Sequence, residues 1–515
     1  MTVAIRRGAP GKGTRRMAAG AAAPAFGSAP RDLRALVEGA LPVDASRLPR
    51  VPVTGLAEDS RRVRPGTLFV AVPGVHEDGA RYAADAARRG AVAVVAERTL
   101  PVSVPTLVVG DARAAGADLA AEFHGRPAGA LACAGITGTK GKTTTSFLLQ
   151  AALEGAGRRT GLVGTVEVRI GERRIPAAHT TPGALELQAH LAGMVDEGCT
   201  HAVLEVSSHA LAQGRTRGIP FRVCVLTNLA SDHMDYHGSP EEYRAAKARL
   251  FEDMPEDSVA AINDADPNAD WFAARARGRV LRYGFDPGCA VGAEDAEIGP
   301  DGVEFTLRVP GGRARLRSPL LGRHNIDNIL AAAAGAHGLG LPVETITSGL
   351  GLLAGVPGRL ERVDRGDRGF RVLVDYAHTE DSLRRVLGFL RPVTPGRLLV
   401  LGGCGGDRDR TKRPRMARAM AELADEAVFT SDNPRTEDPL SILAEMASGV
   451  PAGTPFTVIA DRREAIAALV GRARPGDTLL IAGKGHENTQ DLGSRTVPFD
   501  DREEARRALG IARAG

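Results

Sequence analysis

Short hydrophobic runs, separated by stretches with helical spacing, predict an α/β protein. Apolar positions recur at helical spacing over residues 33–41, and buried-strand patterns follow at 67–72, 91–95 and 105–109. Strands that alternate with helices are typical of a sheet covered by helices. We therefore expect a small N-terminal α/β domain over residues 32–127.

The same alternation continues through residues 128–355, which we expect to form a central domain. The apolar segments 202–206 and 223–227 have the pattern of central strands. Because helical patterns separate the strands, the sheet should be mostly parallel, with helices on both faces.

A Val-Pro-Gly-Arg turn at residues 356–359 marks the start of a third domain, 356–515. Strand patterns at 371–375, 398–401 and 479–482 each run directly into polar or glycine-rich residues. In open α/β sheets, ligands bind just beyond the carboxyl ends of strands. We expect a Rossmann-like C-terminal domain whose post-strand loops form the walls of a site.

Residues 1–31 differ in composition from the rest of the chain. Basic residues at positions 6, 7, 12, 15 and 16 stand among Ala, Gly and Pro, and no acidic residue precedes Asp32. A twin-arginine export signal is one interpretation. The segment after Arg16 is only weakly apolar and is broken by Pro24, so we expect a flexible basic tail instead.

The bulk composition excludes several classes of protein. The chain has 515 residues and is 43% hydrophobic, which suits about three domains with real cores. A net charge of +4 is too small to indicate nucleic acid as a partner. Five scattered cysteines without a C-x-x-C pair indicate a reducing compartment and no zinc site. No run approaches the ~20 apolar residues of a membrane span, so we expect no insertion into a membrane. We further expect a cytoplasmic protein that acts on small molecules, as a monomer.

The segment 135–145, Gly-Ile-Thr-Gly-Thr-Lys-Gly-Lys-Thr-Thr-Thr, joins a strand pattern to a helix pattern. Its glycines let backbone N–H groups approach phosphate oxygens, while Lys142 adds positive charge and Thr143 offers a hydroxyl to Mg²⁺. Such loops usually have Gly where this chain has Ile136, and a glycine turn before an ordinary helix is the alternative. We expect ATP or GTP to bind at Thr137, Gly138, Thr139, Lys140, Gly141, Lys142 and Thr143.

Acidic and histidine side chains follow the next strands. Glu205 lies inside an apolar strand, where a carboxylate needs a partner unless it faces solvent at the sheet edge. The loop 228–237 contains Asp232 and His233, which suit Mg²⁺ or Mn²⁺, although it could be a plain polar loop. Residues 243–248 have the pattern of an exposed amphipathic helix, and on pattern alone Lys247 belongs in solvent.

Charged residues of both signs follow the C-terminal strands. Arg408 lies in a glycine-rich loop, Asp432-Asn433-Pro434-Arg435 follows a short apolar run, and Gly483 and Glu487 follow another strand. Arginines bind carboxylates bidentately, and carboxylates accept hydrogen bonds from ammonium groups. The loops could hold a zwitterion, and surface salt bridges are the alternative.

Taken in order, these segments resemble the Mur ligases of peptidoglycan synthesis from about residue 56 to 490. The motifs that carry the resemblance are Asp59-Ser60-Arg61, Pro65–Phe69, the phosphate loop, Thr180-Thr181-Pro182, Glu205–His209, Asp232-His233, Lys247, His324–Asn328, Asp375–His378 and the three C-terminal loops.

The resemblance implies a reaction in which the γ-phosphate of ATP passes to a glutamyl carboxylate, and an amino acid's amine then displaces it to form an amide. Catalysis of this kind relies on positioning and charge neutralisation. Lys142, Thr143, Glu205 and His233 would serve the phosphates and metal. Asn325, Asn328, Arg359 and Asp375 would hold the nucleoside end.

The resemblance also changes the expectation for Lys247. In the family the matching lysine is carbamylated by CO₂ and becomes an anionic ligand of a second Mg²⁺. Only a neutral amine reacts in this way, and the pKa of lysine shifts readily in buried sites. The implied ligands of the two Mg²⁺ sites are Thr143, Glu205, His233 and Lys247 as N6-carboxylysine.

The family's contacts to a UDP-sugar dipeptide match residues in two parts of the chain. They are Ser60, Val75, His76, Glu77, Thr180, Thr181, Ser207, Gln213 and Arg215. Two departures occur: His179 replaces the asparagine that often precedes Thr-Thr-Pro, and residues 75–77 replace His-Gln-Ala.

In the family the tetrapeptide at 432–435 accompanies diaminopimelate, and Arg408, Gly483 and Glu487 match the other amino-acid contacts. Diaminopimelate is lysine with a carboxylate on its far end, which Arg435 can pair. We expect addition of diaminopimelate to UDP-MurNAc-L-Ala-D-Glu. The meso isomer is our expectation and the LL isomer is an open alternative, since both isomers carry the distal carboxylate. The alternatives are a ligase for L-lysine or another diamino acid, a folylpolyglutamate-synthase-like ligase, and a non-catalytic nucleotide-binding scaffold.

Overall fold

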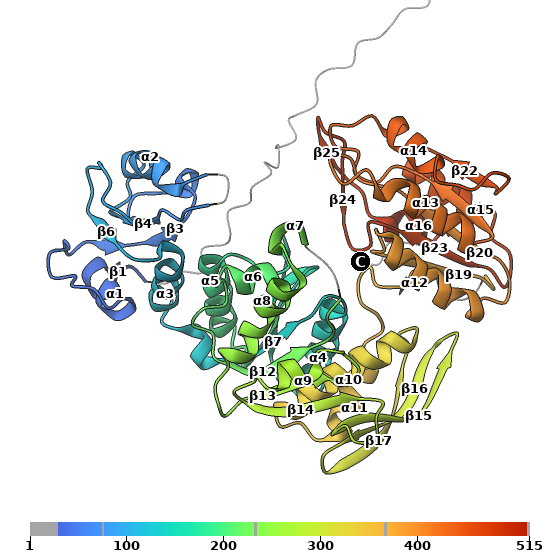
Figure 1. Ribbon diagram of the computed structural model, residues 1–515, viewed down its shortest axis with the longest axis horizontal. Coiled ribbons are helices and arrows are strands. Elements are labelled where there is room, and N and C mark those ends of the chain that lie inside the picture. The colour runs from blue at the N-terminus through green and yellow to red at the C-terminus, as the bar shows by residue number, and fades with distance from the viewer. Residues whose placement is uncertain (1–28, 75–76, 231–233, 365–367, 512–515) are drawn as a thin grey trace, which may run out of the picture. The chain divides into compact units, whose positions relative to one another are not determined.

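The computed structural model describes residues 29–74, 77–230, 234–364 and 368–511. The chain divides into two compact units, Met1–His124 and Gly125–Gly515, and each is described by itself (Figure 1).

The elements of the N-terminal unit are β1 (Arg31–Asp32), α1 (Leu33–Ala40), β2 (Pro52–Val53), β3 (Gly55–Ala57), η1 (Ser60–Arg62), β4 (Thr67–Val70), η2 (Gly79–Tyr82), α2 (Ala83–Arg88), β5 (Ala93–Ala96), β6 (Thr106–Val108) and α3 (Ala112–Phe123). Among its described residues, four parallel strands pair in the order β3-β4-β5-β6. The helix and strands expected from the hydrophobic pattern are therefore present.

Side chains alternate between the two faces of this sheet, and each face packs into a hydrophobic core of its own. Leu68 and Val70 of β4 pack with α1 and α3, whereas Phe69 packs with α2 on the other face. Successive side chains of a strand point to opposite faces, so a continuous apolar run builds a helix–sheet–helix sandwich.

The second unit begins with the elements of a large sheet. They are η3 (Pro127–Ala130), β7 (Ala132–Thr137), α4 (Lys142–Gly155), β8 (Thr160–Val163), β9 (Glu167–Ile170), β10 (Arg173–Pro176), α5 (Ala184–Asp196), β11 (His201–Glu205), α6 (Ser208–Ala212), β12 (Phe221–Leu226), α7 (Met234–His237), α8 (Pro240–Glu252), β13 (Val259–Asn263), α9 (Ala269–Ala273), β14 (Arg279–Gly284), β15 (Val291–Gly299), β16 (Gly302–Val309), β17 (Gly312–Ser318), α10 (Arg323–Gly338) and α11 (Val343–Gly351).

Within the described residues this sheet has eleven strands in the order β10-β9-β8-β11-β7-β12-β13-β14-β15-β16-β17. The central pairs from β8 to β15 are parallel, as expected. Antiparallel strands extend both edges, β9 and β10 on one side and β16 and β17 on the other. These extensions were not anticipated from the sequence.

Helices cover both faces of the central sheet. The helices α4, α10 and α11 contribute to one core with Ala134, Ile136 and Val203, and α4 lies beside α10 (Figure 1). On the opposite face Gly135 of β7 approaches Leu250 of α8 so closely that an added Cβ would lie 3.1 Å from a leucine methyl group. The sheet therefore presents the end of β7 between two helical layers.

The remaining elements build a second large sheet, its helices and a separate two-stranded sheet of β24 and β25. They are β18 (Glu361–Arg362), β19 (Arg371–Asp375), α12 (Glu380–Leu390), η4 (Arg391–Val393), β20 (Leu398–Gly402), α13 (Lys412–Leu423), β21 (Glu426–Phe429), α14 (Pro439–Ala447), β22 (Phe456–Val458), α15 (Arg462–Gly471), β23 (Thr478–Ala482), β24 (Thr489–Asp491), β25 (Thr496–Pro498) and α16 (Asp501–Ala508).

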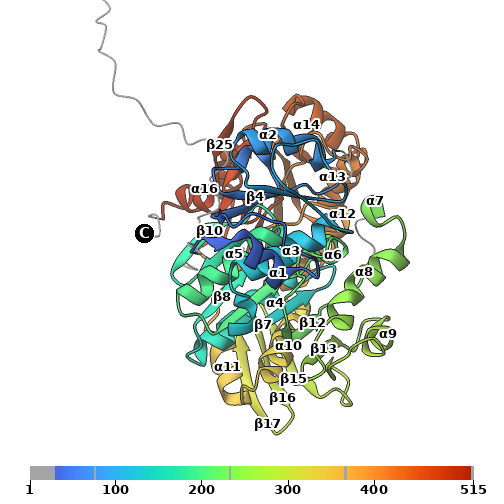
Figure 2. The same cartoon turned by 90° about the vertical axis from the view of Figure 1, so that its left-hand side faces the viewer.

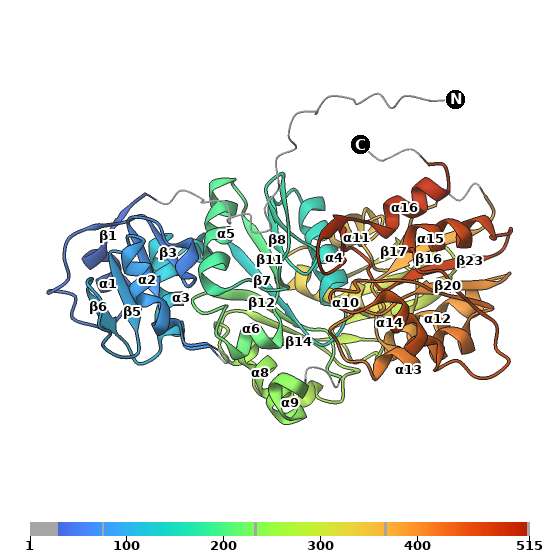
Figure 3. The same cartoon turned by 90° about the horizontal axis from the view of Figure 1, so that it is seen from above.

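In the described part of the chain six strands pair in the order β18-β19-β23-β20-β21-β22, and all pairs except β18–β19 are parallel. Val400 packs with α12, α13 and α14 on one face of this sheet, and Figure 2 shows these three helices together. Its neighbours Leu399 and Leu401 pack with α15 and α16, which lie on the opposite side of the sheet from α12, α13 and α14 in Figure 3. Each buried aliphatic side chain contributes about 1.5–3 kcal/mol, and the arrangement leaves the loops after β19, β20, β21 and β23 at one edge.

No helix in the described ranges is long and apolar enough to cross a membrane. The five cysteines lie within the described ranges, and all are buried free thiols.

Candidate active site

The phosphate loop connects β7 to α4, as expected. Gly138 and Gly141 have φ angles of +145° and +87°, which favour glycine. A Cβ on Gly138 would lie 1.9 Å from Oγ1 of Thr227, so this position accepts no side chain. Nζ of Lys142 donates hydrogen bonds to the carbonyls of Gly138 at 2.8 Å and Thr139 at 3.0 Å, which holds its positive charge over the loop.

The end of β12 braces the same loop. Oδ1 of Asn228 accepts a hydrogen bond from the Lys140 amide at 3.0 Å, and its Nδ2 donates to the Lys140 carbonyl at 2.9 Å. Oγ1 of Thr227 donates to that carbonyl at 2.6 Å. Asn228 begins the predicted ligand-rich segment, so this part of the segment does contact the phosphate loop. Asp232 and His233 lie outside the described residues.

Glu205 ends β11 and is fully buried, so the surface alternative for this residue is wrong. Its carboxylate accepts hydrogen bonds from Oγ1 of Thr143 at 2.9 Å, from the amide and hydroxyl of Thr165, both at 2.9 Å, and from Oγ of Ser146 at 3.4 Å. These donors, all in the described part of the chain, are neutral. A buried carboxylate held in this way suits a cation, because burial of an anion without opposite charge is costly.

A magnesium ion fits this part of the site. Mg²⁺ prefers oxygen ligands, and it binds through one or two carboxylates together with waters and substrate phosphates. Thr143 and Glu205 supply such oxygens beside the phosphate loop. Within the described ranges, no group of three or more His, Cys, Asp or Glu is placed to hold a metal ion.

Lys247 is 1% exposed on α8, so the pattern-based expectation of a solvent position is wrong. Its Nζ donates a hydrogen bond to the Gly138 carbonyl at 2.9 Å and lies 4.6 Å from the ring centre of Tyr243. The Tyr243 hydroxyl in turn lies 3.0 Å from Oγ1 of Thr139. Residues four apart share a helix face, so α8 turns both side chains toward the phosphate loop.

Five of the residues matched to the sugar dipeptide form a continuous group next to Glu205. Oγ1 of Thr181 donates to the Glu205 carbonyl at 2.8 Å and accepts from the Ser207 amide at 3.1 Å. The Arg215 guanidinium donates to the Thr181 carbonyl at 2.6 Å and to Oε1 of Gln213 at 2.8 and 3.0 Å.

Thr180 joins this group through its hydroxyl, which lies 3.0 Å from that of Thr165. Thr165 itself was missed in the sequence. Its position directly beyond β8, the strand next to β11, is the signal that could have identified it.

The other residues matched to the sugar dipeptide belong to the N-terminal unit. Ser60 is buried at the start of η1, and the carboxylate of Glu77 accepts a hydrogen bond from the Tyr82 hydroxyl. Val75 and His76 lie outside the described residues.

The residues matched to the nucleoside lie in two places. A Cβ on Gly141 would lie 2.4 Å from Oδ1 of Asn328, so α10 touches the phosphate loop. Nδ2 of Asn328 donates to Oδ1 of Asn325 at 2.9 Å. Asp375 ends β19, and burial raises the pKa of its carboxyl group. The Arg359 guanidinium lies 4.8 Å from the ring centre of Tyr376.

The loops of the C-terminal sheet bring together the residues matched to the amino acid. Nδ2 of Asn433 donates to Oε2 of Glu487 at 3.0 Å. Nζ of Lys484, which is fully buried, donates to Oδ1 of Asn433 at 3.1 Å and to Oε2 of Glu487 at 3.0 Å. Lys484 was missed in the sequence, where a lysine in a glycine-rich loop looks exposed. Gly483 has a φ angle of +115°, and its added Cβ would lie 2.9 Å from Oδ2 of Asp432.

Arg435 has a left-handed backbone, with a φ angle of +51°. Its amide donates to the Asp491 carbonyl at 3.1 Å, and its Nη1 donates to the Gly406 carbonyl at 2.7 Å. Pro434 precedes it, and Arg408 is exposed on the loop that contains Gly406. The guanidinium of Arg435 thus binds one backbone oxygen, that of Gly406, and its Nε lies 4.0 Å from Oδ2 of Asp491.

Three family descriptions match successive parts of this chain. "Mur ligase family, catalytic domain" matches residues 52–124, "Mur ligase middle domain" matches 136–336, and "Mur ligase, glutamate ligase domain" matches 358–485. A relative from Gloeobacter violaceus is 47% identical over 475 residues, which cover 92% of this chain and 97% of the relative. The chain belongs to the Mur ligase family.

Curated relatives of this Mur ligase have a common description. Those from Gloeobacter violaceus and from Streptomyces coelicolor are each described as "UDP-N-acetylmuramoyl-L-alanyl-D-glutamate--2,6-diaminopimelate ligase". The Streptomyces coelicolor protein is 46% identical, over 89% of this chain and 92% of the relative.

Solved structures support the same assignment of fold. A structure with the same description is 35% identical, with a TM-score of 0.68, and covers 94% of this chain and 99% of its own. Mycobacterium tuberculosis folylpolyglutamate synthase, at 21% identity over 71% of this chain and 90% of its own, with a TM-score of 0.59, shares the fold alone. The expected three-domain α/β fold is confirmed.

Proposed function

We propose that this Mur ligase uses ATP to join diaminopimelate to the D-glutamate of UDP-MurNAc-L-Ala-D-Glu. The observation that carries the proposal is the loop 432–435. Its Arg435 carries a guanidinium, and its Asn433 donates a hydrogen bond to the carboxylate of Glu487. Such a loop offers groups of both charges to a zwitterion. The descriptions of relatives that are 44–47% identical over about nine-tenths of the chain support it.

In the reaction, an oxygen of the glutamyl carboxylate attacks the γ-phosphorus, which gives an acyl phosphate and releases ADP. The amine of diaminopimelate then attacks the acyl carbon, loses a proton and expels inorganic phosphate, which leaves an amide. We assign the phosphate loop from Thr137 to Thr143 to the phosphates of ATP. Its backbone N–H groups and the charge of Lys142 would stabilise the negative charge that builds up during transfer.

Thr143 and Glu205 would hold Mg²⁺ in this scheme, together with His233 and Lys247. When bound, the metal ions would neutralise phosphate charge, which is the usual contribution of Mg²⁺ to phosphoryl transfer. Asn325, Asn328, Arg359 and Asp375 would hold the nucleoside of ATP.

Lys247 would act as a carbamate, with a second Mg²⁺ as its partner. The nearly complete burial of Lys247 supports this assignment, since burial favours the neutral amine that reacts with CO₂. A carbamate nitrogen keeps one N–H group, so the hydrogen bond to Gly138 is compatible with the modification.

The sugar dipeptide would bind through Ser60, Val75, His76, Glu77, Thr180, Thr181, Ser207, Gln213 and Arg215. The group around Thr181 supports this assignment, because it places hydroxyl and guanidinium donors beside Glu205 and thus beside the proposed site of phosphoryl transfer.

Arg435 would select diaminopimelate over L-lysine. A guanidinium pairs with the distal carboxylate of diaminopimelate, whereas the distal end of lysine carries only an ammonium of like charge. Arg408, Asp432, Asn433, Pro434, Gly483 and Glu487 would complete the amino-acid site. We assign these tasks to domains at 32–127, 128–355 and 356–515, in a cytoplasmic monomer with residues 1–31 as a tail.

One assay tests the proposal. ADP release is followed with UDP-MurNAc-L-Ala-D-Glu and, in turn, meso-diaminopimelate, the LL isomer and L-lysine. We expect turnover with the meso isomer and a kcat/KM for L-lysine lower by about a hundredfold or more. Equal use of L-lysine would contradict the role of Arg435, and no ADP release with any of the three would contradict the proposed reaction.

A further inference from the structure

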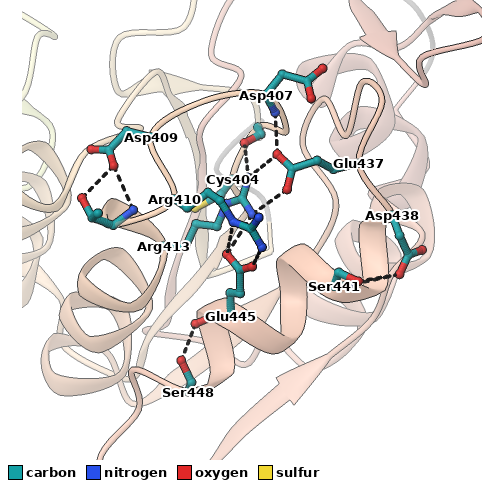
Figure 4. A network of polar contacts seen from close by, with 12 residues as sticks. Cys404, Asp407, Asp409, Arg410, Arg413, Glu437, Asp438, Ser441, Glu445 and Ser448 are labelled. Carbon is teal, nitrogen blue, oxygen red and sulfur yellow. Dashed lines mark hydrogen bonds and ion pairs between the residues drawn. The ribbon is translucent and has the colours of Figure 1, made fainter. Parts of the chain in front are cut away.

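Arg413 lies in the first turn of α13 and is fully buried, with 0% of its side chain exposed. Its Nη2 and Nη1 bind the two carboxylate oxygens of Glu437 at 2.7 and 2.9 Å. Nη1 also donates to Oε2 of Glu445 at 2.9 Å, and Nη2 to the Gly405 carbonyl at 3.3 Å (Figure 4). A single guanidinium thus joins α13, α14 and the two loops that carry Arg408 and Arg435.

Glu437 also contacts the loop that carries Arg408. Its Oε1, which binds Arg413, also accepts a hydrogen bond from the Asp407 amide at 2.6 Å. The Asp407 carboxylate then accepts hydrogen bonds from the hydroxyl of Thr436 at 2.7 Å and from its amide at 3.2 Å. Asp407 precedes Arg408, and Thr436 follows Arg435, so the bonded residues are the direct neighbours of the proposed ligand-binding arginines.

The two loops approach each other very closely at this point. A Cβ on Gly406 would lie 1.9 Å from the Pro434 carbonyl oxygen. Asp407 and Arg435 both have left-handed backbones, with φ angles of +54° and +51°. Non-glycine residues adopt this conformation only where the surroundings hold them in it, at a cost of about 1–3 kcal/mol each.

Arg413 pairs with two carboxylates, those of Glu437 and Glu445, and the geometry of these pairs favours an arginine at position 413. The hydrogen bonds of Arg413 are the largest cause that lowers the pKa of Glu437 to about 2, which shows how strongly the two charged groups interact. A planar guanidinium can bind both oxygens of one carboxylate and still reach a second one, which a lysine ammonium cannot do with the same geometry.

We propose that Arg413 is a positioning residue for amino-acid selection: through Glu437 it fixes the spacing between the loop of Arg408 and the loop of Arg435. This inference rests on the proposed function. The plain alternative is that Arg413 only stabilises the C-terminal sheet and its helices. The positioning role and the purely stabilising role have different consequences. An altered spacing between the two loops weakens the binding of the amino acid alone, whereas loss of domain stability affects all substrates together.

The test compares three conservative single variants of the full-length protein and the double variant of Arg413→Lys with Glu437→Gln. Arg413→Lys keeps the charge but loses the two-point contact with Glu437, and Glu437→Gln keeps the shape but weakens that contact. Arg410→Lys is the matched control, because Arg410 is an exposed arginine that pairs with Glu445. For each protein we would measure the KM values for diaminopimelate, ATP and the UDP-sugar dipeptide, the kcat, and the midpoint of thermal unfolding.

We expect Arg413→Lys and Glu437→Gln to raise the KM for diaminopimelate by about ten- to a hundredfold, since a displacement of about 1 Å can have such an effect. The other two KM values should stay within about twofold, and the double variant should resemble the worse single variant, because both changes break one contact. Arg410→Lys should behave like the unchanged protein.

An unchanged KM for diaminopimelate in both variants would overturn the inference, as would equal losses for all three substrates. If Arg413→Lys fails to fold, Glu437→Gln alone decides between these outcomes. The proposed function is tested first and separately, by ADP release from the unchanged protein with diaminopimelate. If another amino acid is used instead, the same KM comparison is made with that amino acid.

Discussion

Nζ of Lys247 and the carbonyl oxygen of Gly138 are joined by a hydrogen bond of 2.9 Å, across 109 positions of sequence. The bond brings a buried amine of α8 to the loop that we assign to the phosphates of ATP. A carbamate formed on this amine would lie beside the phosphates, where an anionic oxygen can serve a metal ion.

Lys247→Ala should therefore lower kcat by about a hundredfold or more, as the loss of one essential electrostatic group does elsewhere. Short carboxylic acids added to the variant should restore part of the activity, since they can replace the missing carboxylate. ADP release measures both effects. The control is the unchanged protein, which the acids should not activate, and full activity of the variant without additives would contradict the carbamate.

Glu205→Gln should raise the Mg²⁺ concentration needed for half-maximal activity and lower kcat. Glutamine keeps the shape of the side chain but removes the negative charge that suits a cation at this buried position. The measurement is the rate of ADP release during a Mg²⁺ titration. Glu154→Gln, at a half-exposed position on α4, is the control, and an unchanged Mg²⁺ requirement in Glu205→Gln would remove this residue from the metal site.

Arg435→Ala should cost diaminopimelate use far more than ATP binding. Its guanidinium is the partner that we assign to the distal carboxylate, and loss of a charged partner in a shielded site costs about 2–5 kcal/mol. We would measure kcat/KM for diaminopimelate and the KM for ATP. Arg415→Ala, an exposed arginine of α13, serves as the control. An amino-acid preference that stays the same in Arg435→Ala would contradict the assignment.

The hydrophobic pattern predicted the strands that carry the site, because strand ends and polar loops are both local features of sequence. Glu205 at the end of β11 and Asp375 at the end of β19 lie where the apolar runs placed them. Asp438 caps the N-terminus of α14, where its carboxylate accepts a hydrogen bond from the Ser441 amide at 3.0 Å.

The buried cations could not be predicted in the same way. Arg413, Arg462 and Lys484 are each at most 1% exposed, although average behaviour assigns such residues to solvent. Their partners lie on loops and helices that are distant in sequence, so only the folded chain shows that their charge is compensated. The burial of Lys247 was anticipated only through the resemblance to Mur ligases.

The ion pair between Arg462 and Asp501 should be important for stability. Both side chains are fully buried, and they meet through two hydrogen bonds of 2.7 Å. Asp501→Asn leaves the arginine charge without its partner, which costs about 3–5 kcal/mol. Urea unfolding followed by circular dichroism measures the change.

The control for this prediction is Asp257→Asn, which removes an exposed pair with Arg222 and should change the free energy of unfolding by less than about 1 kcal/mol. Equal stability of Asp501→Asn and Asp257→Asn would contradict the role of the buried pair.

Acid should weaken the C-terminal domain partly through His486. Burial, with smaller effects of the Arg359 and Arg502 charges, lowers the pKa of His486 from 6.5 to about 4. Between these two pH values the unfolded imidazole binds a proton that the folded one does not, so the stability contributed by His486 is full above pH 6.5 and falls as the pH drops toward 4.

His486→Gln should therefore lose less stability between pH 7 and pH 5 than the unchanged protein does, as measured by thermal unfolding at both pH values. His179→Gln, at an exposed position, should keep the full pH dependence. The same pH dependence in His486→Gln as in the unchanged protein would contradict this source of acid sensitivity.

The phosphate loop begins at a strand of one sheet, whereas the loops of Arg408 and Arg435 begin at strands of another. On our assignment, changes in the choice of amino acid can thus be made by evolution, or by directed mutagenesis, without touching the loop that holds the phosphates of ATP. The close packing at Gly406 also means that a side chain at this position would clash with the loop of Arg435. A library aimed at a new amino acid should vary Arg408, Arg435 and Glu487 and keep the glycines between them.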